Sequence, residues 1–83
     1  MNFINKNVTD KDKDLFFGPV GPTDFFIEIK DNWIMAHIIK NAGIFPSTSQ
    51  AKKNGWDKEI PKGFTELMVG KKAKRKNIFI LNI

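Results

Sequence analysis

The chain has 83 residues, a formal net charge of +5, no cysteine and ten large aromatic side chains, eight of them Phe. This length allows one domain of modest stability, and the lack of cysteine excludes disulfides, thiolate metal sites and cysteine nucleophiles. The apolar runs are far shorter than the ~20 residues of a membrane-spanning helix, and the first residues are too polar for a secretory signal. We therefore expect a cytoplasmic domain that does not contact a membrane.

Charge is divided unevenly along the chain. Residues 1–31 carry four Lys and six acidic residues, whereas residues 32–83 carry ten basic and three acidic residues, a net charge of +7. Because basic side chains neutralise phosphates and release their counterions, the second part is a candidate nucleic-acid-binding surface. The alternative is a merely solvated surface, since the abundance of Lys, Ile and Asn is typical of any AT-rich genome, such as that of a phage or low-GC bacterium. Thirteen Lys to one Arg favours contacts with the phosphate backbone over the reading of base edges.

Residues 1–22 predict an extended N-terminal arm, and residues 23–83 an α+β core. The alternating charges of residues 9–14 indicate an exposed turn or linker. Leu15–Phe17 then predicts a short strand or an extended segment, and the two Gly–Pro pairs that follow exclude both a helix and a central strand.

The segment after the Gly–Pro pairs allows two assignments. In the first, Phe25–Lys30 is a strand, and Asp31 or Asn32 caps a helix from Trp33 to Asn41. In the second, a single helix runs from Asp24 to Asn41. The dominance of Phe and Ile in the first half favours the strand followed by the helix.

A second, short helix is predicted next. Ala42-Gly43 is a typical C-cap for the preceding helix, and Ser47-Thr48-Ser49-Gln50 has the capping-box pattern of a new one. Lys52 and Lys53 fall in its last turn, where positive charge suits the helix dipole. Gly55 ends this helix.

The C-terminal residues predict a β-hairpin. Phe64–Val69 and Ile78–Ile83 are the strands, and the basic segment Gly70–Asn77 is a turn that partly extends them, because eight residues are many for a hairpin turn. The last strand is also a candidate for edge-to-edge pairing with a second copy, which would give a homodimer. The predicted fold class is α+β: a small single domain with one or two helices in the middle and a C-terminal β-hairpin packed against them.

The sequence offers no recognisable catalytic or metal-binding constellation. His37 is the only histidine, and no nucleophile or carboxylate accompanies it at an informative spacing. Asp10, Asp12 and Asp14 resemble the start of a calcium loop, but the Gly and Glu that would complete such a loop are absent. We therefore expect no enzymatic activity, no metal and no cofactor.

Ala42-Gly43-Ile44 followed by Ser-x-Ser-x-Ala-Lys-Lys at residues 47–53 forms a pattern with a known counterpart. Residues 33–53 resemble the alpha-L RNA-binding motif, found in one small-subunit ribosomal protein, in pseudouridine synthases and in a tyrosyl-tRNA synthetase appendage. The chain departs from that motif at Asn54-Gly55, where the second helix usually continues, and by the insertion of residues 56–63. The resemblance implies that the start of the second helix and its two terminal lysines face an RNA backbone.

The leading hypothesis is a small basic nucleic-acid-binding module, with RNA favoured over DNA. A capped helix and a lysine-rich turn would contact phosphates, and a Trp would either stack on a base or fill the core. The candidate site residues are Ser47, Thr48, Ser49, Lys52, Lys53, Trp56, Lys71, Lys72, Lys74, Arg75 and Lys76. The alternative is an accessory or inhibitor protein of a phage or mobile element that docks on an acidic protein surface.

Overall fold

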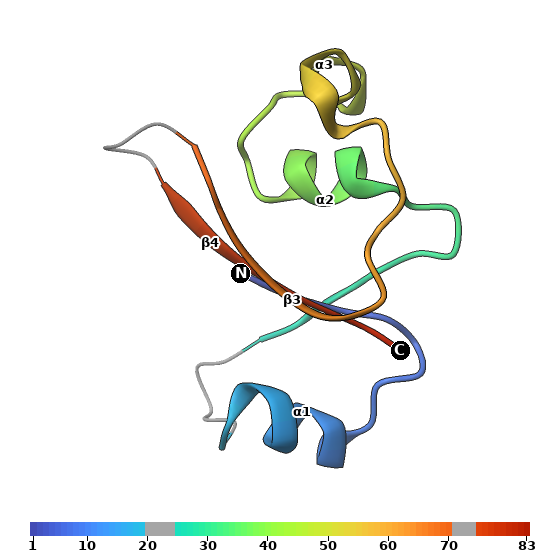
Figure 1. The fold of residues 1–83 in the computed structure, drawn as a ribbon, viewed down its shortest axis with the longest axis vertical. Helices are drawn as coiled ribbons and strands as arrows, with labels where there is room; N and C mark the ends of the chain where they lie inside the picture. Colours follow the sequence, from blue (N-terminus) through green and yellow to red (C-terminus); the bar gives the residue numbers. More distant parts are fainter. Residues whose placement is uncertain (20–24, 71–74) are drawn as a thin grey trace.

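A four-stranded β-sheet forms the middle layer of the molecule, with one helix on one face and two shorter helices on the other (Figure 1). The computed structural model describes residues 1–19, 25–70 and 75–83. In chain order the elements are β1 (Asn2–Ile4), α1 (Asp10–Phe17), β2 (Ile27–Glu28), α2 (Met35–Asn41), α3 (Thr48–Ala51), the wide helical turn η1 (Lys52–Trp56), β3 (Gly63–Val69) and β4 (Lys76–Asn82). The predicted α+β fold, with the C-terminal hairpin packed against helices, is confirmed.

The sheet has the strand order β2-β1-β4-β3. Strand β1 runs parallel to both of its neighbours, whereas β3 and β4 form the predicted antiparallel hairpin. Strand β4 therefore has a partner on each side, and the expected pairing of Ile78–Ile83 with a second copy is wrong, because this strand has no free hydrogen-bonding edge. The free edges of the sheet belong to β2 and β3.

The core lies between the sheet and the pair α2 and α3. Side chains alternate along β3, with every second residue exposed, as expected for a strand with one covered face. The register pairs Thr65 with Ile80 and Leu67 with Ile78, so these side chains share the face toward α2. The largest fully buried side chains are Phe3, Ile38, Ile39, Ile78, Ile80 and Leu81.

Helix α1 covers the opposite face of the sheet. Its Phe17 ring packs edge-on against Phe26, Phe64 and Phe79, with ring centroids 5.2, 5.4 and 6.5 Å away. The ring of Phe16 stacks on Phe64 at 5.6 Å. This aromatic cluster lies on the face that carries the buried Leu81, since Phe64 and Leu81 are partners across the hairpin.

The prediction of an extended N-terminal arm is wrong. Strand β1 is an interior strand of the sheet, and its Phe3 is completely buried. The charged residues 10–14 begin α1, where the Asp12 amide donates to Thr9 Oγ1 (3.2 Å) and the Thr9 amide donates to Asp12 Oδ2 (3.0 Å). This reciprocal cap compensates for the weak helical periodicity, and Leu15–Phe17 forms the last turn of the helix rather than a strand.

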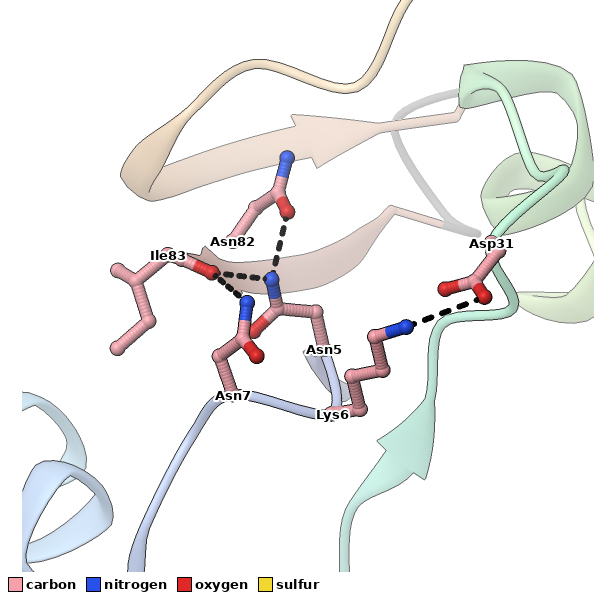
Figure 2. Close-up of polar contacts among 6 residues, drawn as sticks. All are labelled: Asn5, Lys6, Asn7, Asp31, Asn82 and Ile83. Carbon is pink, nitrogen blue, oxygen red and sulfur yellow. Dashed lines mark hydrogen bonds and ion pairs between the residues drawn. The ribbon is translucent and has the colours of Figure 1, made fainter.

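Hydrogen bonds beyond the strands fix the N-terminal segment to the C-terminus (Figure 2). The Asn5 side-chain amide donates to Asn82 Oδ1 (3.0 Å) and to the Ile83 carbonyl (2.6 Å), which also accepts from the Asn7 side chain (2.8 Å). Nearby, Lys6 pairs with the exposed Asp31 at 3.2 Å. These contacts bring together residues almost the whole chain apart, so the first and last residues belong to one folding unit.

Of the two assignments for the middle segment, the strand followed by a helix is correct, with tighter bounds. Strand β2 has two residues, and α2 begins at Met35 rather than at Trp33. Its N-cap is Ile34, not Asp31 or Asn32. Ile34 has no side-chain acceptor for the first helical amides, but its own amide donates to Nδ1 of His37, the third residue of the helix, at 3.0 Å. His37 thus takes the place of the Glu or Gln of a capping box.

In the second half, Ser47 caps α3 and Lys76 and Asn77 extend β4 as predicted. Gly43, with a φ of +81°, follows the end of α2 as predicted. Residues 71–74 of the predicted turn lie outside the described residues.

Helix α3 ends at Ala51, however, so Lys52 and Lys53 lie in η1 and not in the last turn of α3. Gly55, with a φ of +93°, lies inside η1. Within residues 1–19, 25–70 and 75–83, no helix is long and apolar enough to cross a membrane.

Candidate functional site

A mostly apolar groove separates the far end of the β3–β4 hairpin from the segment that joins α2 to α3. It has a volume of about 580 Å³. The residues that line it are Gly43, Ile44, Phe45, Trp56, Val69, Gly70, Arg75 and Lys76. Three of them, Trp56, Arg75 and Lys76, are candidate site residues from the sequence.

The turn after α2 forms one wall of the groove. The Gly43 amide donates to the Lys40 carbonyl (3.0 Å) and the Ile44 amide to the Ile39 carbonyl (3.3 Å), which satisfies carbonyl groups at the end of the helix. The positive φ of Gly43 makes this reversal possible without a steric penalty. The chain then presents Ile44 and Phe45, both half-buried against the core.

Trp56 forms a second wall at the end of η1. Its ring is half-buried and packs against the core, and the Lys58 ammonium lies 5.0 Å from its centroid. Trp56 therefore packs against the core, one of the two roles considered for it, and also lines the groove. Stacking on a base stays a prediction.

The hairpin brings two cations to the groove. Lys76 faces the helical layer, because its strand partner is the half-buried Val69, and its ammonium donates to the Ala42 carbonyl at 2.7 Å. That carbonyl lies at the negative end of the α2 dipole. Arg75 also lines the groove, but its guanidinium lies 3.7 Å from Met68 Sδ. Met68 alternates with Val69 along β3, so this contact lies toward the α1 face of the sheet. No carboxylate in the described parts of the chain forms an ion pair with either cation.

The remaining predicted site residues are less directly connected to the groove. Lys52 and Lys53 are exposed on η1, the turn that also carries Trp56. The Ser47 hydroxyl already accepts from the Gln50 amide (3.2 Å) as a cap, and α3, which includes Thr48 and Ser49, has only four residues. The candidate residues Lys71, Lys72 and Lys74 lie outside the described residues.

The uneven charge along the sequence becomes an uneven charge across the sheet. Helix α1, on one side of the sheet, carries three Asp and two Lys, a net charge of −1. The layer on the other side, residues 35–56, carries three Lys and no acidic residue. None of the described residues that line the groove is acidic, so its charge complements that of an anionic ligand.

Phe45 is the functional candidate that the sequence analysis missed. It precedes Pro46 in a turn between two helices, where a large aromatic residue could be recognised as a packing residue but not assigned to a groove. The other residues that line the groove, from Trp56 to Lys76, come later in the chain. Only the tertiary structure brings Phe45 together with them.

His37 takes part in a local structural contact. Besides accepting from Ile34, its ring stacks on Trp33 with the centroids 5.8 Å apart and the planes 7° from parallel. Among the described residues, no three His, Asp or Glu side chains gather where they could hold a metal ion.

No family model, curated protein or solved structure matches the chain. The resemblance of residues 33–53 to the alpha-L motif therefore remains a prediction from the sequence.

Proposed function

We propose that the protein is a small RNA-binding module whose contact surface is the groove together with the exposed lysines of η1. The observation that carries the proposal is the juxtaposition of two aromatic residues, Phe45 and Trp56, with the ammonium of Lys76, in a groove that Arg75 also lines. Nucleic acids offer the complementary chemistry of flat rings joined by phosphates.

The cations of the groove are suited to phosphate because no carboxylate among the described residues forms an ion pair with them. Lys76 uses one of its three ammonium donors for Ala42, which leaves two for a ligand. Lys52 and Lys53, being exposed on the same turn as Trp56, can add contacts to neighbouring phosphates. Lys is a flexible point charge, so this binding should depend weakly on sequence.

Fluorescence anisotropy with a labelled single-stranded RNA tests the proposal. We expect a Kd on the order of micromolar at ~50 mM salt, and a steep loss of affinity toward ~200 mM because phosphate contacts release counterions. Replacing both Lys52→Ala and Lys53→Ala should weaken binding and reduce the slope of log K against log salt by about 1.4.

The matched control removes the same charge from the other side of the molecule. Lys11 lies on α1 and Lys30 follows β2, and both are exposed. The double variant Lys11→Ala, Lys30→Ala should keep the wild-type salt slope. If no RNA or DNA binds at ~50 mM salt, the proposal is wrong.

A protein-docking role is the second candidate, and a separate observation favours it. Leu15, Phe16 and Phe25 are 75%, 40% and 69% exposed, which is unusual for three large apolar side chains in a short chain. Docking through such residues would be nearly independent of salt. Failure of every nucleic acid to bind would make this candidate the leading one.

A further inference from the structure

We infer that the groove holds one unpaired nucleobase, so that the ligand is single-stranded RNA and not a duplex. This inference rests on the proposed RNA binding and adds to it a defined subsite and a ligand class. The walls of that subsite are Phe45 and Trp56, and its charged rim is formed by Arg75 and Lys76.

The size and lining of the groove fit a single nucleotide. Its volume of about 580 Å³ lies within the range of small-ligand sites. Ile44 and Val69 add further apolar surface to the two aromatic side chains. A base placed in such a groove would leave its ribose and phosphate toward the rim.

Charge distinguishes a nucleotide from an uncharged apolar occupant. An apolar peptide segment would cover the aromatic walls but would leave the two cations beside it without an anionic partner. A nucleotide supplies an anionic phosphate close to a flat ring. The Arg75 guanidinium contacts only a weak acceptor, Met68 Sδ, toward the α1 face of the sheet. It can therefore leave this contact and turn to a phosphate oxygen at the rim of the groove.

Secondary structure of the RNA then decides whether the groove can be filled. The bases of an A-form duplex are stacked and paired, so a base can enter an aromatic groove only after leaving the helix. An unpaired strand presents its bases freely. A single-stranded RNA should therefore bind more tightly than a duplex RNA with the same number of phosphates.

Three ligands with about the same number of phosphates separate base insertion from charge alone: a labelled oligouridine of about sixteen nucleotides, a fully abasic ribose-phosphate oligomer of the same length, and the duplex of a self-complementary G·C-rich octamer. We expect the oligouridine to bind roughly tenfold more tightly than the abasic oligomer, which corresponds to the stacking of one base. The duplex should also bind more weakly than the single strand.

Two tryptophan variants report where the base lies. In Trp33→Phe the only remaining indole is Trp56, and its fluorescence should fall when oligouridine binds and stay unchanged with the abasic oligomer. In Trp56→Phe the only indole is Trp33, which stacks on His37 outside the groove, and its fluorescence should not change. Both substitutions keep an aromatic ring, and circular dichroism checks that both variants fold.

The outcomes separate this inference from the proposed function. Equal affinities for all three ligands, with no change in Trp56 fluorescence, would overturn base insertion and leave RNA binding through charge intact. Failure of all three ligands to bind at ~50 mM salt would overturn both.

Discussion

At the scale of single residues, His37 shows how a side chain that could be catalytic serves the backbone. Helix α2 begins at Met35, and its N-cap residue Ile34 has no side-chain acceptor; Nδ1 of His37 accepts from the Ile34 amide. An unpaired amide at a helix start costs free energy. The single histidine is therefore accounted for by a helix cap and by its stacking on Trp33.

We predict that His37→Ala lowers the free energy of unfolding by about 1 kcal/mol, because the Ile34 amide loses its acceptor. RNA binding should be unchanged, because His37 does not line the groove. Urea denaturation measures the first effect and anisotropy the second. Gln50→Ala, an exposed position in α3, serves as the control. Loss of binding in a folded His37→Ala protein would place this residue in the functional surface.

At the scale of elements, the end of α2 and the hairpin are held together at one point. The Lys76 ammonium bonds to the last residue before Gly43, and a Cβ atom added to Gly43 would lie 2.9 Å from that ammonium. Gly43 thus has two requirements, a positive φ and space for a cation. A side chain at position 43 would therefore displace the Lys76 ammonium from its place at the groove.

We predict that Gly43→Ala lowers the free energy of unfolding by about 1–2 kcal/mol from backbone strain, and more where the Lys76 bond is lost. It should also weaken RNA binding, because Lys76 must move. Gly63→Ala is the matched control, since Gly63 has a φ of +87° but open space at the Cβ position. Gly63→Ala should lose stability without losing RNA affinity. If the two variants have the same free energy of unfolding and the same RNA affinity, Lys76 does not contribute to RNA binding through its position beside Gly43.

The elements that the sequence predicts correctly are those with local signals. The Ser47 cap, the glycine turns and the β-branched hairpin strand act within a few residues, and the structure contains all of them. Strand β1 was missed because its stability comes from two neighbours far away in the chain. Periodicity does not predict helix α1, because its short, charged first turns have few apolar residues; the local signal for this helix is the Thr9–Asp12 capping box.

At the scale of the whole molecule, the candidate site is assembled from three separate parts of the chain. The turn after α2, the end of η1 and the tip of the hairpin meet only because both helical segments pack on one face of the sheet (Figure 1). The sequence indicates which residues carry charge and which carry rings. It does not indicate that Phe45 and Lys76 line the same groove, since that depends on tertiary packing.

The most direct test of RNA binding through this groove is a titration of ¹⁵N-labelled protein with single-stranded oligouridine, followed by amide NMR. We predict chemical-shift changes at Gly43–Phe45, at Lys52–Trp56 with the Trp56 indole N–H, and at Val69 and Lys76, while α1 remains unchanged. Chemical-shift changes confined to α1, or no shift changes at ~50 mM salt, would contradict RNA binding through the groove.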